Sequence, residues 1–257
     1  MNKGLKYIKA LAIILILLGL IAYVVFAMFV MTSPDPDEKC ADVELVVDES
    51  AKVKFIDARQ VEKMLRKKHL YPKGRLMKDV DTRAIEDLLR GNEFVDSVEC
   101  YKTASGKLCI NIRQRTPVMY VMPNGQEGYY VDAAGKIIPG DVFTSNLVVA
   151  SGDITQKYAS EVLSGFGEFL LKNEFWNNQI EQIYVYLDRE KKPVVELIPR
   201  VGDHVVYMGS MDGYKKKLRR LQIFYEKAMG IVGWNKYERI NLEFNNQIVC
   251  TKRKNKK

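Results

Sequence analysis

The sequence is poor in the residues that usually carry chemistry. It has two histidines, His69 and His204, and neither stands in a metal-binding spacing such as HExxH. It contains no GxSxG nucleophile elbow, no GxxxxGKS/T phosphate loop and no GxGxxG dinucleotide loop. These absences argue against the hydrolases, nucleoside triphosphatases and dinucleotide-binding enzymes that depend on such motifs. The sequence therefore predicts no catalytic residue, no metal ion and no cofactor.

Cysteine is scarce as well. The chain has Cys40, Cys100, Cys109 and Cys250, and no two of them form a CxxC pair, which argues against a zinc site. Four cysteines allow three complete pairings in an oxidising compartment, and the sequence leaves these open. Cys100 and Cys109 fall on neighbouring predicted strands but on opposite faces, because strand side chains alternate. We therefore expect these two not to be bonded to each other.

The body of the chain has no excess of positive charge, although the whole chain carries a net charge of +8. The three lysines of residues 1–9 and the five basic residues of 252–257 account for all of it, so residues 10–251 are neutral overall. A domain that binds nucleic acid needs a basic surface. The sequence therefore predicts no nucleic-acid partner.

What the sequence does have is one long apolar run, without a charged residue from Ala10 to Met31. A helix of about 20 apolar residues crosses the hydrocarbon core of a bilayer. The alternative is a cleaved signal sequence, whose apolar region is about 7–15 residues and ends in small residues. This run is longer and ends in Phe29-Val30-Met31. We predict an uncleaved transmembrane helix over residues 10–31.

The charges beside this run predict its orientation. Three lysines precede it and three acidic residues follow it: Lys3, Lys6, Lys9, Asp35, Asp37 and Glu38. Basic residues favour the cytoplasmic side. We expect residues 1–9 to form a cytoplasmic tail and the chain from Thr32 onward to lie outside, beginning with a linker over residues 32–42.

Residues 43–115 predict a small module with the order strand, helix, helix, strand, strand. The expected strands are 43–47, 94–101 and 107–115, and the expected helices are 57–69 and 81–90. Asp57 is a good N-cap for the first helix, and Asp79 or Asp81 for the second. A three-stranded sheet backed by two helices buries one face of every element.

After Pro117 the sequence predicts a mainly antiparallel β domain with two helices over residues 116–251, which makes the whole fold α+β. The expected strands are 118–122, 128–132, 136–138, 147–150, 180–187, 193–199, 204–208, 237–244 and 247–251, and the helices are 158–172 and 211–229. The basic run 215–220 is expected to be a solvated helix face, with an anion site as the alternative. Residues 252–257 form a basic tail.

These modules and several short motifs resemble a known family. Residues 43–115 are similar to the POTRA module of bacterial envelope proteins. Arg115-Thr116-Pro117-Val118 and the segment 129–136 resemble the boundary motif and the Y-V-D-x-x-G motif of the cell-division family FtsQ/DivIB. Segments 206–209 and 239–244 resemble two of its later strands. The motif residues are Arg115, Pro117, Tyr130, Asp132, Gly135 and Gly209.

The resemblance implies a non-enzymatic scaffold of the division machinery in the inner membrane at the septum, with its main body outside the cytoplasm. It implies binding to two small bitopic coiled-coil proteins, FtsB-like and FtsL-like, regulation of septal peptidoglycan synthesis through them, and contacts of the POTRA module with other division proteins. Two alternatives stay open: another POTRA-type polypeptide-binding module of the envelope, and a membrane-tethered cell-wall enzyme.

The end of the β domain is the candidate partner site. A last strand can form a sheet edge with unpaired N–H and C=O groups, and a partner can add an extended segment there. The candidate residues are Asn241, Leu242, Glu243, Phe244, Gln247, Ile248, Val249, Cys250 and Thr251. Asn241, Glu243 and Phe244 depart from the family's usual Asp, Arg and Tyr. Phe244 and Ile248 are expected to be apolar contacts, with ordinary core residues as the alternative.

Overall fold

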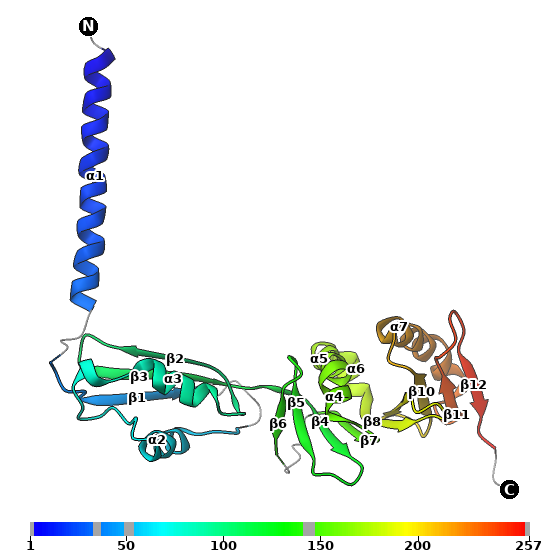
Figure 1. Cartoon of the computed structure of the whole chain (residues 1–257). Helices are drawn as coiled ribbons and strands as arrows, with labels where there is room; N and C mark the ends of the chain where they lie inside the picture. The colour runs from blue at the N-terminus through cyan, green and yellow to red at the C-terminus, as the bar shows by residue number, and fades with distance from the viewer. Residues whose placement is uncertain (1–2, 33–36, 49–53, 141–146, 255–257) are drawn as a thin grey trace. The chain divides into compact units, whose positions relative to one another are not determined.

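The computed structural model describes residues 3–32, 37–48, 54–140 and 147–254. They form an N-terminal helix and two folded units, of which the first ends at Gln114 and the second begins at Arg115 (Figure 1). The α+β fold expected from the sequence is confirmed. Residues 1–2, 33–36 and 255–257, which belong to the predicted tails and linker, lie outside the described residues.

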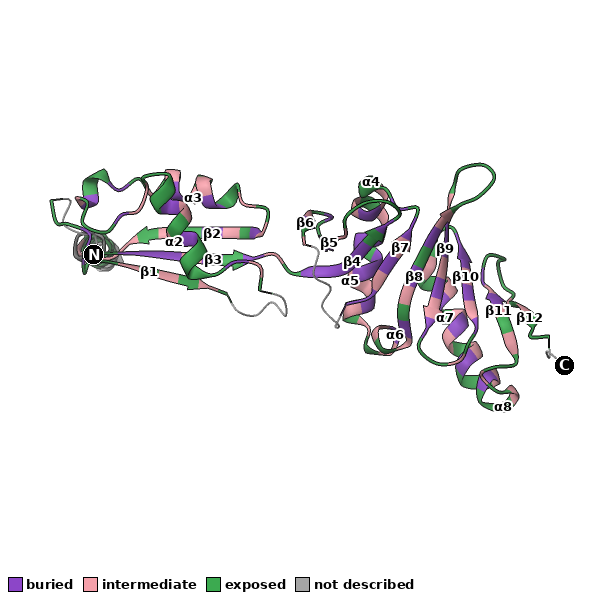
Figure 2. Cartoon of the chain, turned by 90° about the horizontal axis from the view of Figure 1, so that it is seen from below, coloured by how far each residue is buried: buried purple, intermediate pink, exposed green. Residues whose placement is uncertain are grey.

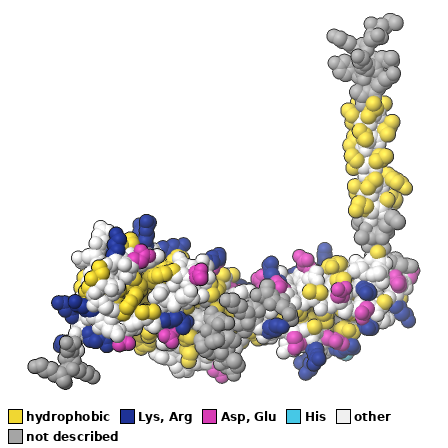
Figure 3. Space-filling model, turned by 180° about the vertical axis from the view of Figure 1, so that it is seen from behind, with side chains coloured by type: hydrophobic (Ala, Val, Ile, Leu, Met, Phe, Trp, Pro, Cys, Tyr) yellow, Lys and Arg dark blue, Asp and Glu magenta, His cyan; other side chains and the backbone are white. Residues whose placement is uncertain are grey.

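The N-terminal helix α1 spans Lys3–Thr32 and so begins within the predicted tail. Its window from Leu11 to Met28 is long and apolar enough to cross a membrane, and no part of that window is buried inside the protein. Figure 3 shows its hydrophobic side chains exposed along the helix, whereas charged side chains are scattered over the folded units. The helix therefore has the form of a single membrane span.

The first unit has the predicted order of elements. They are β1 Asp42–Val47, α2 Ala58–Lys67, a 3-10 turn Met77–Asp79, α3 Thr82–Arg90, β2 Val95–Lys102 and β3 Lys107–Gln114. The sheet order is β1-β3-β2, with β1 parallel and β2 antiparallel to β3. Asp57 and Asp81 cap the two helices, each accepting a hydrogen bond from a backbone N–H of the first turn.

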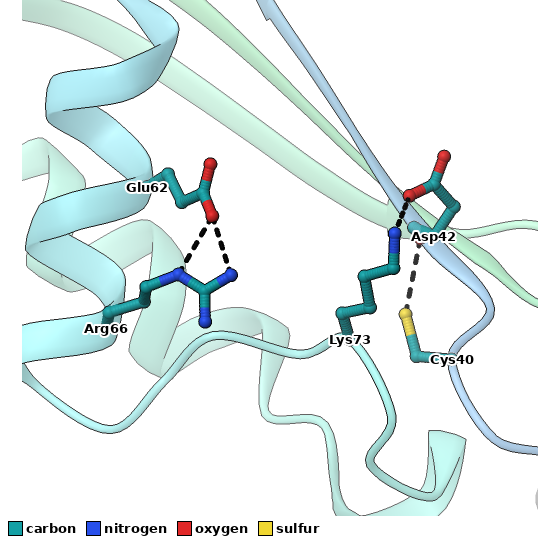
Figure 4. Close-up of polar contacts among 5 residues, drawn as sticks. All are labelled: Cys40, Asp42, Glu62, Arg66 and Lys73. Atoms are coloured by element: carbon teal, nitrogen blue, oxygen red, sulfur yellow. Dashed lines mark hydrogen bonds and ion pairs between the residues drawn. The ribbon is translucent and has the colours of Figure 1, made fainter.

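Cys40 anchors the start of this unit ahead of β1. Its side chain is only 2% exposed and belongs to the core, and its N–H donates to the Arg75 carbonyl. Its thiol donates to the Asp42 carbonyl, and the Asp42 carboxylate pairs with Lys73 at 2.8 Å (Figure 4). Residues 38–41, which the sequence analysis assigned to the linker, are thus held against the folded unit.

The cysteines of the first sheet lie on opposite faces, as expected. Cys100 stands opposite Ile110, whereas Cys109 stands opposite Tyr101. Since cross-strand partners share a face and neighbours along a strand do not, the two thiols are separated by the sheet. All four cysteines are free thiols.

The second unit is built on one mixed sheet of nine strands. Its strands are β4 Pro117–Pro123, β5 Tyr129–Asp132, β6 Ile137–Pro139, β7 Val149–Gly152, β8 Ile180–Leu187, β9 Pro193–Pro199, β10 Val205–Gly209, β11 Tyr237–Asn241 and β12 Val249–Lys252. Their order is β12-β11-β10-β9-β8-β7-β4-β5-β6. Antiparallel pairs outnumber the three parallel ones, which are β4/β7, β7/β8 and β10/β11.

Two long helical segments pack on one face of this sheet (Figures 1 and 2). The first runs through α4 Gln156–Tyr158, a π-helical turn Ala159–Leu163 and α5 Ser164–Lys172, and the second through α7 Tyr214–Phe224, a π-helical turn Tyr225–Met229 and α8 Gly230–Val232. Phe166 and Leu218 from these helices meet Val195 and other sheet residues in the core. A further helix, α6 Glu174–Gln179, was not predicted, because its six residues are too few to show a helical period.

The buried histidine of this core predicts a pH-dependent stability. His204 is 1% exposed, and its Nε2 lies 2.7 Å from the Tyr225 hydroxyl oxygen. Burial disfavours the imidazolium and lowers the pKa of His204 below its ordinary value. The unfolded chain then binds the proton more tightly than the folded chain does. The contribution of neutral His204 to the free energy of unfolding is therefore fully present above about pH 6.5, and it is lost as the pH drops toward the lowered pKa.

Chemical denaturation at a series of pH values from about 7 to about 5 tests this expectation. His204→Gln should lose less stability over that interval than the wild type. His69→Gln, which changes the other histidine, is the matched control and should behave as the wild type. Equal losses in His204→Gln and the wild type would contradict the assignment.

Candidate partner-binding site

The last strand is an outer strand of the nine-stranded sheet. Among the described residues β12 pairs with β11 and with no second strand. The Arg253 N–H donates to the Lys236 carbonyl across this pair. Because backbone groups alternate along a strand, the N–H and C=O groups of Lys252 and Cys250 point away from β11. The outer side of β12 thus offers main-chain groups to a further strand.

Fewer residues lie at the sheet edge than the sequence predicted. Asn241 lies in β11, which is an inner strand, and pairs with Tyr207 on β10 as well as with Val249. Leu242 is wholly buried in the core, and its N–H donates to the Tyr207 carbonyl. These two residues support the edge from inside and present no surface for strand pairing. The strand expected over 237–244 ends at Asn241.

Arg220 on α7 holds the turn between β11 and β12. Its guanidinium donates to the carbonyl oxygens of Leu242 at 2.8 Å, Phe244 at 2.6 Å and Gln247 at 3.2 Å. The turn also contains Asn246 at φ +63°, a left-handed conformation that asparagine tolerates better than most residues. One side chain thus satisfies three carbonyls that face no strand partner, and this fixes where β12 begins.

The two apolar residues of this turn have different roles. Phe244 is 45% exposed, and so is available as a contact. Ile248 is partly buried and packs on the core, as Cys250 does. Val249 is 44% exposed at the start of the edge strand. Of the two alternatives, a surface contact fits Phe244 and a core role fits Ile248.

The remaining candidates, Glu243, Gln247 and Thr251, have exposed side chains beside the edge. The structure adds Ile223, which is 45% exposed on α7, one turn beyond Arg220. Ile223 was not predicted because it stands outside the apolar stripe of its helix.

The basic run of α7 divides into two groups. Lys215, Lys216 and Arg219 are exposed, as predicted. Lys217 is not: its ammonium donates to the carbonyls of Met208 and Ser210, each at 2.8 Å, and burial lowers its pKa. The expectation of a solvated face was therefore wrong for Lys217 and for Arg220. Lys217 binds carbonyls at the end of β10, and Arg220 binds carbonyls in the turn ahead of the edge strand.

The motif residues Arg115 and Asp132 form a largely buried ion pair at the other end of the sheet. Their nearest atoms are 2.9 Å apart, and their side chains are 17% and 8% exposed. The second oxygen of Asp132 accepts a hydrogen bond from the Lys136 N–H. Pro117 stands opposite Asp132 in the β4/β5 pair. The boundary motif and the Y-V-D-x-x-G motif therefore meet in one structural contact.

The other motif residues are also structural. Tyr130 is buried and its ring packs against that of Tyr120, with the centroids 4.8 Å apart and the planes inclined at 55°. Gly135 has φ +77°, and a side chain there would collide with the carbonyl of Ser160, whose hydroxyl donates to the Gly135 carbonyl. Gly209, at φ +65°, follows a bulge in β10 and faces Glu243. It is the motif residue nearest the candidate edge in strand order.

The Arg115–Asp132 contact predicts strong coupling between the two side chains. Arg115→Met leaves a buried carboxylate without its cation, and we expect the free energy of unfolding to fall by about 3 kcal/mol. The double variant Arg115→Met, Asp132→Asn should lose less than the sum of the two single variants, as measured by denaturation in a double-mutant cycle. Additive losses would show that the pair does not interact in solution.

The Arg220 contact predicts that the turn loosens when the guanidinium is removed. We expect Arg220→Ala to lower the free energy of unfolding by about 1–2 kcal/mol, because three carbonyls lose a charged donor. Amide hydrogen exchange of Val249–Lys252 should become faster. Arg219→Ala, the exposed neighbour, should change neither quantity. Unchanged exchange in Arg220→Ala would mean that the turn holds without this contact.

Two family models match the chain. The one described as "FtsQ/DivIB, C-terminal related" covers residues 116–251, and the one described as "POTRA-like domain" covers residues 38–113. No curated protein matches the chain. The first match alone takes in more than half of the 257 residues, and these include Asp132 and the edge strand up to Thr251. With its apolar helix α1, the chain is a single-pass membrane protein of cell division and belongs to the FtsQ/DivIB family.

Proposed function

We propose that this chain is a non-enzymatic scaffold of the division machinery that binds FtsB-like and FtsL-like proteins and regulates septal peptidoglycan synthesis through them. Membership of the FtsQ/DivIB family supports the general role. The observation that carries the binding proposal is the position of β12 as the outer strand of its sheet.

The proposed mechanism is strand addition. An extended segment of the partner pairs with the outward N–H and C=O groups of Cys250 and Lys252, which supplies affinity without demanding a particular sequence. The exposed side chains of Val249 and Thr251 give selectivity. Because Arg220 already fixes the turn ahead of β12, little conformational entropy is lost when the partner binds.

The proposal also places the protein in the inner membrane at the septum, with its N-terminus in the cytoplasm and both folded units outside. The three lysines ahead of the span support this orientation. In this arrangement the POTRA-like domain is the contact for other division proteins.

A proline in the edge strand is the sharpest test. Lys252→Pro removes an outward N–H while leaving the ladder to β11 intact, and its side chain is exposed, so the fold should survive. We expect the affinity of the full chain in detergent micelles for the outer-side segment of its FtsB-like partner to fall at least about tenfold.

Lys252→Ala is the matched control, since it removes the charge and keeps the N–H. Its affinity should stay within about twofold of the wild type, because the outward N–H is kept. Equal binding by Lys252→Pro and Lys252→Ala would rule out strand addition at this edge. A wild-type chain that binds neither an FtsB-like nor an FtsL-like protein would overturn the scaffold proposal itself.

A further inference from the structure

The outer side of α2 in the first unit carries a concentrated positive charge. Residues 58–78 contain eight lysines and arginines but only one acidic residue, Glu62. Four of the cations are exposed at positions i, i+4, i+7 and i+8 of the helix, and therefore share one face: Arg59, Lys63, Arg66 and Lys67. We name these four residues the basic face. The core residues of α2, Val61 and Leu65, lie on the opposite side of the helix.

The stability of the helix does not account for the basic face. Arg59 and Lys67 each lie four residues from Lys63, and like charges at this spacing repel each other. The helix dipole favours Lys67 in the last turn, but it disfavours Arg59 in the first. Within the described part of the chain, the one acidic partner of the basic face is Glu62, 2.6 Å from Arg66. The face thus costs the helix stability, which argues for a role in binding an anion.

The acidic residues at the entrance to the unit are neutralised or turned away. Asp42 forms an ion pair with Lys73 at 2.8 Å (Figure 4), and Asp37 forms one with Lys78 at 2.7 Å. Glu44 lies on the face of the small sheet opposite the helices, where it accepts a hydrogen bond from the Cys109 thiol. These carboxylates therefore do not offset the charge of the basic face.

The chain holds this unit close to the membrane that α1 crosses. Helix α1 ends at Thr32, and Asp37, five residues later, is already bound to Lys78 of the folded unit. Five extended residues span at most about 18 Å. The tether gives the bilayer surface a high effective concentration at the unit, so even a weak attraction is enough to populate a docked state. The membrane is thus the anionic surface that is always within reach.

We propose that the basic face of α2 docks on anionic lipid headgroups of the membrane in which α1 is anchored. Lysine and arginine donate charge-assisted hydrogen bonds to phosphate oxygens, and clusters of them beside a membrane span are attracted to anionic lipid. Docking turns the opposite face of the small sheet away from the bilayer and so fixes the orientation of the first unit. The inference goes beyond the proposed partner binding at β12 and does not depend on it.

Acetylation of native lysines tests the docking. The full chain is reconstituted in nanodiscs of phosphatidylcholine, or in nanodiscs in which phosphatidylglycerol replaces half of it, and treated with an uncharged acetylating reagent. Mass spectrometry then gives the rate at each lysine. We expect Lys63 and Lys67 to react at least about threefold more slowly in the anionic discs, as they would if the face were docked for two-thirds of the time.

Salt and a distant lysine are the controls for this measurement. The protection should vanish at about 1 M salt, where the screening length is about 3 Å. Lys191, exposed in the turn between β8 and β9 of the second unit, should react equally in both kinds of disc.

A pair of arginine variants shows whether the basic face is responsible. Arg59→Gln, Arg66→Gln removes two charges of the face and keeps both reporter lysines, so their protection in the anionic discs should fall below about 1.5-fold. The matched variant Arg189→Gln, Arg200→Gln changes two exposed arginines of the second unit and should keep the full protection. Thermal denaturation of each variant checks that the fold is intact.

The outcomes are distinct from those of the partner-binding test. Equal rates at Lys63 and Lys67 in the two kinds of disc overturn the proposal, and so does protection that the variant Arg59→Gln, Arg66→Gln leaves unchanged. Protection that appears in neutral discs only when an acidic division protein is reconstituted with the chain overturns the lipid assignment and gives the face to a protein. Binding at β12, measured in neutral discs, is unaffected by any of these results.

Discussion

Burial of one sheet face under the helices is the interaction on which the β domain depends. The core extends over this face from β5 to β11, with Phe166 and Leu218 supplied by the two long helical segments. Such a core fixes strand register, because a slip of one residue would move every side chain of a strand to the other face. Register in turn decides which side chains of each strand enter the core and which lie on the helix-free face.

Charged side chains on α7 donate hydrogen bonds to backbone carbonyls, and these contacts help to hold the edge of the sheet in place. Lys217 reaches from α7 to carbonyl oxygens at the end of β10, and Arg220 reaches to carbonyl oxygens in the turn that follows β11. A carbonyl in a turn has no strand partner, and a cation that satisfies it stabilises the turn without adding a strand. The β domain thus keeps an ordered edge while leaving its outer main-chain groups available.

The Arg115–Asp132 ion pair and the candidate edge strand occupy different parts of the sheet. Asp132 and Arg115 pair on β5 and beside β4, whereas β12 lies at the opposite end of the strand order. The motif residues build the fold. They provide an ion pair between Arg115, ahead of β4, and Asp132, at the end of β5, and glycines where a side chain would collide or strain the backbone. Under the proposed function, partner choice falls to side chains that the fold leaves exposed, such as those of Phe244 and Val249.

The sequence by itself determined the apolar span, the capped helices of the POTRA-like unit and the order of most strands. These follow from local signals: an uncharged run, Asp57 and Asp81 ahead of apolar periods, and turn residues between alternating segments. Leu242 and Phe244 look alike in the same pattern, yet one is core and the other surface. Only the tertiary structure decided between them. The burial of each side chain depends on which strand neighbours β11, and that is set by contacts between residues far apart in the chain. The same holds for Arg220, whose role depends on a turn more than 20 residues away along the chain.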